Sequence, residues 1–440
     1  MENVDRHVAG FVLEIQWRDL PAEVQLRAVM CSIDVLGAML AGTVTPVAGI
    51  GRRAAARYFP GTSASILPGG TRASLPGAAL ANGFAANALD IDDGHPLIKG
   101  HPGAVVFPAL MAAAEFRRTR FQDFLAALVS AYEVAVRAGL VMQEHYHYYH
   151  SSGAWGAVGA AAGVARLFGF DDSRVVQAVS VADFHAPLVP VMRSVRRPAM
   201  SKDGVGWGSM TGVLAAMMAG EGFTGGGSLF TWPEGRSKVM DLGGTYEIMN
   251  VYFKSYACCR WAHPAIDAVI DLRQAHQFKP ADVEKIRVKT FGAAAELYRE
   301  KPGDTEQAQY NAVYPIAAAM AAGEVGPTQV LMDSGLSSEI FPLMDRVEIC
   351  IDERFEKLFP ARRLCEVEIL LKDGRIFVSG IYESGPGHQT PVSLEWIIEK
   401  FHRLTDGILP ENRAGELIAL LTAPEKNPPV GDIIKVMAQP

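Results

Sequence analysis

The densest cluster of proton-exchanging side chains in the sequence lies between positions 90 and 101. Three carboxylates and two imidazoles fall within these twelve residues: Asp90, Asp92, Asp93, His95 and His101. A proline follows each histidine and restricts the backbone that carries the ring. Imidazoles held in this way suit proton donors or acceptors, because they titrate near neutral pH. A helix terminus with solvated acids before a proline-bounded loop would have the same composition, so this cluster alone leaves both interpretations open.

A second stretch, from His145 to Gly153, combines histidines with tyrosines. Imidazole is a frequent metal ligand. However, no H-E-x-x-H motif and no cysteine pair at zinc spacing accompanies these histidines. We therefore predict no metal site, aromatic packing at a helix terminus for most of these side chains, and a functional role for no more than one of the histidines.

Cationic side chains precede a glycine-rich segment further along the chain. Arg193, Arg196, Arg197 and Lys202 come before glycines at positions 204, 206 and 208. Cations near a helix N-terminus can bind a carboxylate, although a solvated basic loop explains the arginines equally well. The glycine spacing is similar to a dinucleotide-binding fingerprint, but no strand precedes it, so we expect no such cofactor.

The segment from Lys254 to Pro264 holds two adjacent cysteines among cationic side chains. Nothing in the sequence indicates a lowered thiol pKa, so buried structural cysteines are the simpler interpretation. Lys254, Arg260 and His263 are the better candidates for an anion site. Tyr310, in the segment 307–311, carries no signal by itself.

The elements that must position these residues are mainly helices. From position 24 to about position 220, alanine-rich segments with helical periodicity follow one another, and several are apolar on more than one face, as buried helices are. After position 246, alternating runs at VEKIRVKTF, RVEICIDE and CEVEILLKDGRIFVSGIYE predict strands, with a hairpin at Lys372-Asp373-Gly374. We expect a mainly α protein with a large all-helical domain, residues 1–255 and 395–440, and a smaller α+β lid domain, residues 256–394.

Composition excludes several classes of protein. A formal net charge of −7 gives no reason to expect nucleic acid as a partner. The five cysteines, an odd number, predict reduced thiols and a cytoplasmic location. The N-terminal segment lacks the pattern of a signal peptide, and we expect no apolar run long enough to span a membrane.

Taken in order, these segments resemble the MmgE/PrpD family, which contains 2-methylcitrate dehydratase, cis-aconitate decarboxylase and iminodisuccinate epimerase. The resemblance extends over roughly residues 10–400. The first matching segments are Asp90–Gly94 with His101–Gly103 (family Asp-aromatic-Asp-Asp-Thr and His-Pro-Ser) and Tyr148–Ser152 (Gly-Trp-His-Pro-Thr). Next come Lys202 with Gly222–Gly225 (a lysine, a glycine- and alanine-rich helix, then Gly-Phe-Thr-Gly). The last are Lys254–Asp267 (Lys-x-Tyr/Phe-x-x-Cys-Arg-x-x-His-Pro-Ala-Ile-Asp) and Gln307–Asn311 (Asp-Ala-Gln-Tyr/Phe-Ser). The chain departs from the family at Gly94, which replaces threonine, and at 148–152, where only the histidine is kept.

The resemblance implies a homodimer with a polar pocket between the two domains and no metal or organic cofactor. The catalytic residues would be Asp90, His101, His150, Lys202 and Tyr310. The substrate-binding residues would be Asp93, His95, Lys99, Lys254, Arg260 and His263.

Members of this family create or quench negative charge on a carbon next to a carboxylate. Preorganised cations can stabilise that charge, typically by a few kcal/mol per donor. We therefore expect a cofactor-independent lyase, a dehydratase or decarboxylase, acting on a small di- or tricarboxylate. In this hypothesis Lys202, Lys254 and Arg260 hold carboxylates, His101 and His150 exchange the proton, and Asp90 orients an imidazole. An epimerase or isomerase of a substituted succinate is the first alternative, and a non-catalytic carboxylate-binding protein is the second.

Overall fold

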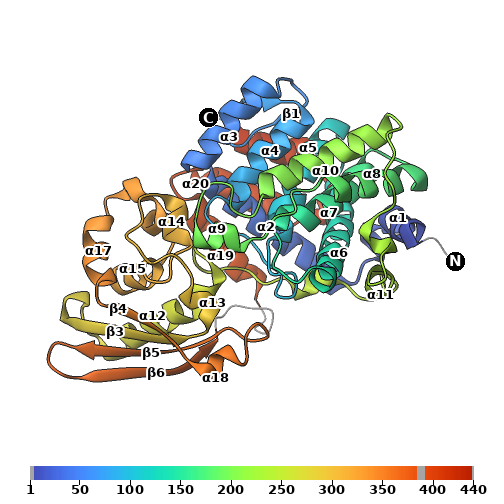
Figure 1. Ribbon diagram of the computed structural model, residues 1–440. Coiled ribbons are helices and arrows are strands. Elements are labelled where there is room, and N and C mark those ends of the chain that lie inside the picture. The colour runs from blue at the N-terminus through green and yellow to red at the C-terminus, as the bar shows by residue number, and fades with distance from the viewer. Residues whose placement is uncertain (1–3, 384–391, 439–440) are drawn as a thin grey trace.

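The computed structural model describes residues 4–383 and 392–438. A large helical part and a smaller part containing a four-stranded sheet lie side by side (Figure 1). The helices of the first part are α1 (Val4–Glu14), α2 (Ala22–Gly42), α3 (Pro46–Tyr58), α4 (Leu75–Asn87), α5 (Pro102–Arg117), α6 (Phe121–His145), α7 (Ser152–Leu167), α8 (Asp172–His185), α9 (Met192–Arg196), α10 (Val205–Gly220) and α11 (Gly235–Val239). This arrangement confirms the predicted mainly α fold with a smaller α+β part. One departure is a two-residue antiparallel ladder, β1 (Ala64–Ser65) with β2 (Arg72–Ala73), between α3 and α4.

Close helix packing explains the many glycines and alanines of the first part. Helix α7 is buried over most of its length and packs against α6 and α10. A Cβ atom placed on Gly208 of α10 would lie 2.6 Å from the Cα atom of Gly153 of α7. Only residues without side chains allow two helix backbones to approach so closely, so these glycines fix how α7 and α10 cross. The crossing lies near the first residues of both helices, close to the candidate site.

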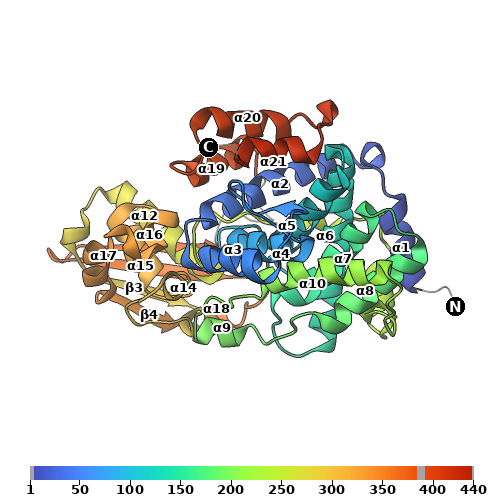
Figure 2. The same ribbon diagram turned by 90° about the horizontal axis from the view of Figure 1, so that it is seen from above.

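The end of the chain returns to the helical part, as its periodicity predicts. Helices α19 (Leu394–Thr405), α20 (Glu411–Leu421) and α21 (Val430–Ala438) lie on the α2 side of that part (Figure 2). Ile397 and Phe401 of α19 belong to the same core as α2. On the same helix, the ammonium group of Lys400 lies 2.6 Å from the carboxylate of Asp34, and both side chains are buried.

The smaller part is built on a sheet of strand order β4-β3-β5-β6, formed by β3 (Val283–Thr290), β4 (Val347–Ile351), β5 (Leu364–Leu371) and β6 (Ile376–Glu383). All four coincide with the predicted alternating runs. β3 pairs in parallel with β4 and antiparallel with β5, and β5 and β6 form the predicted hairpin, in which Gly374 adopts φ +89°. Its helices are α12 (His263–His276), α13 (Gly292–Ala295), α14 (Thr305–Gln309), α15 (Tyr314–Ala322), α16 (Pro327–Val330), α17 (Ser337–Met344) and α18 (Glu353–Glu356).

Two hydrophobic cores correspond to the two parts. One contains buried residues from Val8 to Phe253 and again from Ile397 to Met437, and the other is built mainly from residues between Ala257 and Leu371. Leu89 and Ile91, from the cluster of acids and histidines, belong to the second core although α4 belongs to the first. The segment after α4 therefore lies where the two parts meet. The domain limits at 255/256 and 394/395 stay predictions.

By length and composition alone, two helices, α2 and α6, could span a membrane. This differs from our expectation that no apolar segment would be long enough to do so. Their most apolar windows are 83% and 94% buried inside the fold, which is the position of core helices in a soluble enzyme. All five cysteines are unpaired in the structure.

Candidate active site

A cavity lies at the junction of the two parts. Its lining comes from the segments after α4, before α7 and before α12, from α9 and its flanks, and from the residues just after α14 and just before β5. The lining residues are Asp90, Lys99, Gly100, His101, Tyr149, Val191, Val195, Asp203, Tyr252, Lys254, Cys259, Arg260, Trp261, Tyr310 and Arg363. Six of the eleven residues predicted from the sequence are among them: Asp90, Lys99, His101, Lys254, Arg260 and Tyr310.

Backbone strain is concentrated around this cavity. Six non-glycine residues of the described chain have positive φ, and three of them are Asp90 (φ 51°), Lys99 (φ 56°) and Lys202 (φ 38°). The left-handed conformation is unfavourable for residues with a Cβ atom, and residues held there cluster at functional sites. The fold therefore forces these three side chains into positions that the local sequence does not favour.

His101 is the centre of a group of acids. It is the N-cap residue of α5, so its ring is carried at a helix start fixed by Pro102. Its Nδ1 atom lies 2.9 Å from a carboxylate oxygen of Asp92 and 3.0 Å from the carbonyl oxygen of Asp93. Its Nε2 atom lies 3.2 Å from Asp90 and 3.6 Å from Asp203. Burial by itself would lower the pKa of His101, but Asp92 and Asp90 outweigh it and raise the pKa well above its ordinary value. His101 is therefore an imidazolium at neutral pH.

A buried ion pair fixes the opposite oxygen of Asp90. The ammonium group of Lys254 lies 2.8 Å from this carboxylate, and both side chains are at most 2% exposed. Burial tends to raise the pKa of Asp90, but Lys254 and His101 outweigh it and hold that pKa far below its usual range. Burial tends to lower the pKa of Lys254, but Asp90 reverses the effect and raises it. Asp90 is thus an anion between two cations.

Lys202 links the two parts of the molecule behind the cavity. Its ammonium group donates to the carbonyl oxygen of Asn87 at the end of α4 and, at 2.8 Å, to the amide oxygen of Gln309 in α14. It lies 5.7 Å from the centre of the Tyr310 ring and also lines a neighbouring cavity beside α9. Burial lowers the pKa of Lys202 in spite of Asp90 and Asp92.

Several acids near His101 have raised pKa values because they are buried. Burial, together with Asp34 and Asp92, raises the pKa of Asp93 to about 8. Asp93 does not line the cavity; it accepts hydrogen bonds from the backbone of Gly103 and from the Tyr132 hydroxyl. Burial also raises the pKa of Asp203, which does line the cavity, to about 6. Asp203 is therefore poised to gain or lose a proton near neutral pH.

The remaining predicted histidines lie outside the lining. His95 is fully buried and lies 3.2 Å from Glu247. The Nε2 atom of His263 lies 3.1 Å from the carbonyl oxygen of Cys258, a bond that closes the turn before α12. Both therefore have structural partners.

His150 is buried beside Tyr146 and Tyr148, as the aromatic composition of its segment predicts. By distance and angle neither ring nitrogen makes a full hydrogen bond with a described residue, and the nearby backbone of Met142 offsets the effect of burial only in part. Burial, followed by the charge of Lys99, lowers its pKa to about 4, so the ring is uncharged at neutral pH. It adjoins Tyr149, which lines the cavity. An imidazole with such a lowered pKa is a weak base at neutral pH, so it accepts a proton only when a stronger acid faces it.

Sequence reasoning missed Asp203, Arg363, Tyr252 and the pair Asp34–Lys400. Asp34 and Lys400 left a signal: Asp34 is the one charged residue in the second half of the apolar helix α2, and an acid in such a position needs a buried partner. Arg363 left no signal, because only the fold brings the start of β5 to the cavity.

A metal site was not predicted, but the structure offers one group of side chains of the required kind. Within residues 4–383 and 392–438, ligand atoms of Asp90, Asp92 and His101 lie within 4.8 Å of one another. The carboxylates of this group already have cationic partners, because His101 is itself an imidazolium and Lys254 contacts Asp90. A divalent cation would have to displace the proton of His101 and compete with Lys254, so this donor set does not fit a resident metal well.

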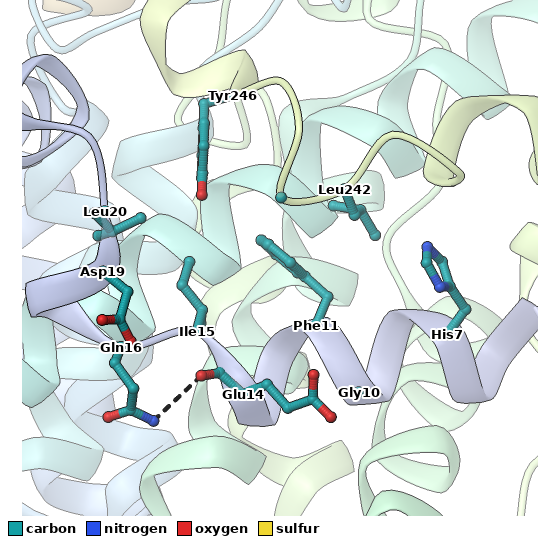
Figure 3. A pocket seen from close by; sticks show the side chains of 11 residues that line it. His7, Gly10, Phe11, Glu14, Ile15, Gln16, Asp19, Leu20, Leu242 and Tyr246 are labelled. Carbon is teal, nitrogen blue, oxygen red and sulfur yellow. Dashed lines mark hydrogen bonds between the residues drawn. The ribbon is translucent and has the colours of Figure 1, made fainter.

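A larger cavity of about 430 Å³ lies at the other end of the helical part, beside α1 (Figure 3). His7, Glu14 and Asp19 face it from around α1, while Leu242 and Tyr246 face it from the opposite wall. The lining of this second cavity contains no cluster of acids and cations comparable with that around His101. The volume of a cavity is therefore a poor guide to the active site of this protein.

Comparisons with known proteins identify the family of this chain. The sequence model of the MmgE/PrpD N-terminal domain matches residues 6–249, and that of the MmgE/PrpD C-terminal domain matches residues 256–423. The chain belongs to the MmgE/PrpD family. The resemblance inferred from the motifs is thereby confirmed.

The relatives of this MmgE/PrpD protein include enzymes named as decarboxylases. It is 24% identical to the cis-aconitate decarboxylase-like protein oryM of Aspergillus oryzae, with 99% of this chain and 97% of that protein covered. It is 21% identical to the cis-aconitate decarboxylase of Aspergillus terreus (96% and 93% covered) and 24% identical to that of Homo sapiens (88% and 85% covered). These relatives support a lyase-type enzyme.

Proposed function

We propose that this MmgE/PrpD protein is a cofactor-independent lyase that acts on a small di- or tricarboxylate, and that decarboxylation is its reaction. The observation that carries the proposal is the imidazolium of His101 in a buried cavity that also holds Lys254, Arg260 and Lys99. The names of the relatives, cis-aconitate decarboxylases, support the same reaction class.

In the proposed reaction, the carbon–carbon bond to one carboxylate breaks and carbon dioxide leaves. The electron pair stays on the substrate carbon and delocalises into a neighbouring carboxylate, which Lys254 and Arg260 stabilise. His101 then donates its proton to that carbon, and the surrounding acids stabilise the charged form of the ring until the transfer. Asp90 positions both His101 and Lys254. Tyr310 lines the cavity from the smaller part, and Lys202 lies behind the cavity, where it bonds to Gln309. His101 regains its proton from solvent between turnovers, and His150, which is uncharged, can act only as a proton acceptor.

Dehydration is the second candidate, and Asp203 favours it. A hydro-lyase needs a base that removes a proton from carbon as well as an acid that protonates the departing hydroxide. A carboxyl group with a pKa of about 6, at 3.6 Å from His101, can act as that base. Epimerisation of a substituted succinate needs the same two groups, and a non-catalytic carboxylate-binding protein would need neither.

The cavity has a volume of about 70 Å³, which holds only a few water molecules. A di- or tricarboxylate therefore requires the side chains at the partly exposed edge, such as Lys99 and Arg363, to move outward on binding. Closure of these side chains over the substrate would exclude water from the charged carbon.

Proton NMR in deuterium oxide tests the proposal and separates its alternatives. The panel contains cis-aconitate, 2-methylcitrate, citrate and substituted succinates. Loss of carbon dioxide with one deuteron incorporated at the product carbon supports decarboxylation, and a new vinyl signal from a hydroxy acid supports dehydration. Deuterium uptake without net conversion indicates epimerisation. Binding without any spectral change over the whole panel contradicts the enzymatic proposal.

We also propose that the protein acts as a cytoplasmic homodimer without nucleic acid. The unpaired cysteines are consistent with a reducing compartment. Large apolar side chains of α10, those of Trp207, Leu214, Met217 and Met218, are exposed, which supports a protein interface on this helix.

A further inference from the structure

Tyr252 is a wall of the cavity that the chain holds by its backbone. Its amide donates to the carbonyl oxygen of Gly94 at 2.8 Å, and the amide of Gly94 donates to the carbonyl oxygen of Tyr252 at 2.9 Å. The next residue, Phe253, is fully buried in the core of the helical part. Two backbone hydrogen bonds and a close-packed neighbour therefore fix the position of Tyr252.

The tip of the Tyr252 ring lies against the backbone of Gly94. A Cβ atom placed on Gly94 would lie 2.5 Å from both the Cζ atom and the hydroxyl oxygen of Tyr252, which is far inside the distance of an ordinary contact. The pattern of the family has a threonine at this position, where the chain has glycine. The ring in its present place and a side chain at position 94 exclude each other.

Tyr252 differs in this respect from the side chains at the edge of the cavity. It is only 8% exposed, and the Arg260 guanidinium lies 4.5 Å from the centre of its ring. Lys99 and Arg363 are partly exposed and can move outward when a substrate binds. Since the cavity has a volume of only about 70 Å³, the wall that cannot move limits what fits against it.

We propose that Gly94 and Tyr252 together form a size filter: glycine at position 94 admits the Tyr252 ring, and the ring limits the bulk of the substituents on the carbon chain of the substrate. Unbranched dicarboxylates are therefore preferred over branched ones. This inference rests on the proposed function in one respect, since it assumes that the substrate carboxylate binds in this cavity.

Calorimetric binding of two non-reacting probes tests the size filter. Succinate is unbranched, and 2,2-dimethylsuccinate carries the same two carboxylates with two added methyl groups. One added methylene group changes the preference of a tight pocket by about 10-fold to 200-fold, so the wild-type protein should bind succinate at least about tenfold more tightly. Tyr252→Ala should reduce this ratio to about threefold or less, because the space of the ring becomes free for the methyl groups.

Exchanging the two residues provides a second test. In the double variant Gly94→Thr with Tyr252→Ala, the threonine fits and fills part of the space of the ring, so the ratio should rise again above that of Tyr252→Ala. Gly94→Thr alone forces the ring out of its place. It should therefore unfold at a lower temperature than the double variant, although the double variant carries one more change.

Two variants serve as controls. Tyr252→Phe keeps the ring and removes only the hydroxyl, so the ratio should stay close to that of the wild type. Tyr246→Ala shortens a tyrosine of the same segment that lines the cavity beside α1 (Figure 3), and it should leave the ratio unchanged. Circular dichroism shows whether each variant is folded. If Tyr252→Ala is not, Tyr252→Leu takes its place and should lower the ratio in the same direction.

An unchanged ratio in folded Tyr252→Ala overturns the size filter, as does a wild-type protein that binds both probes equally or binds neither. A ratio that falls as far in Tyr252→Phe as in Tyr252→Ala also overturns it, because the hydroxyl would then make the distinction. Turnover of the carboxylate panel is measured separately. A ratio that follows the ring without any turnover would leave the size filter standing and remove the lyase proposal, whereas turnover with a ratio independent of the ring would do the reverse.

Discussion

Replacing Asp90 by asparagine tests whether this carboxylate keeps His101 charged. The substitution preserves the size of the side chain but removes the negative charge that lies 3.2 Å from the His101 ring and 2.8 Å from the Lys254 ammonium. Two buried cations then lose a shared partner. Removing one partner of a buried ion pair typically costs about 3–5 kcal/mol of folding free energy, so the variant should be folded but less stable.

The size of the pKa change follows from the distances. Three carboxylates face the His101 ring, Asp92 at 2.9 Å, Asp90 at 3.2 Å and Asp203 at 3.6 Å. Because Coulomb energy falls with distance, Asp90 supplies about a third of their combined effect. An adjacent opposite charge typically shifts a pKa by about 1–3 units, so the pKa of His101 should fall by about one unit in Asp90→Asn.

The sign of the activity change follows from the proposed role. If the imidazolium donates the proton, activity is lost as pH rises through the pKa of His101. The alkaline limb of the kcat profile should therefore move to lower pH by about one unit in Asp90→Asn. Carbon-13 NMR of labelled histidine measures the same pKa without a substrate, and the His101 signal is assigned by its absence in His101→Gln.

Glu247→Gln is the matched control, because Glu247 pairs with His95 at the same 3.2 Å distance but outside the cavity. It should lower stability less than Asp90→Asn, since the Glu247 side chain is 19% exposed and that of Asp90 only 2%. It should also leave the His101 titration unchanged. A His101 pKa that stays the same in Asp90→Asn would refute the electrostatic reasoning.

Three further predictions concern the surroundings of the site. The pKa of Asp93 is raised to about 8 in the folded protein, whereas an Asp carboxyl of the unfolded chain loses its proton at about pH 4. Proton binding by Asp93 therefore stabilises the fold below that unfolded pKa, and the stabilisation is lost as pH rises to about 8. In Asp93→Asn the free energy of unfolding should no longer fall with pH by the Asp93 contribution of about 1.4 kcal/mol per pH unit. If the free energies of unfolding of the two proteins change in parallel at all pH values, this prediction is wrong. Lys400→Met should lower the free energy of unfolding by about 3–5 kcal/mol in chemical denaturation, because it leaves the buried Asp34 unpaired. The double variant Lys400→Met with Asp34→Leu should recover most of this loss. If it does not, the unpaired charge is not the cause of the destabilisation. Met217→Lys on the exposed face of α10 should shift the protein from dimer to monomer in light scattering, whereas a wild-type protein that is monomeric at micromolar concentration would exclude the dimer.

Local patterns determined the elements of the fold. Alternation placed all four strands of the lid sheet, and the Lys372-Asp373-Gly374 turn placed its hairpin, because both depend on residues a few positions apart. Alanine and glycine content predicted buried helices for the same reason. The order of the motifs along the chain was sufficient to indicate the family.

Tertiary structure decided which side chains form the site and how they are charged. His101, Lys254, Tyr310 and Arg363 are remote in sequence, and only the junction of two cores brings them to one cavity. In the sequence His95, His150 and His101 are similar candidates. In the structure His95 pairs with Glu247, His150 is uncharged among tyrosines, and acids hold His101 as an imidazolium. Protonation depends on burial and on neighbours within a few ångströms, and neither quantity is defined until the chain is folded.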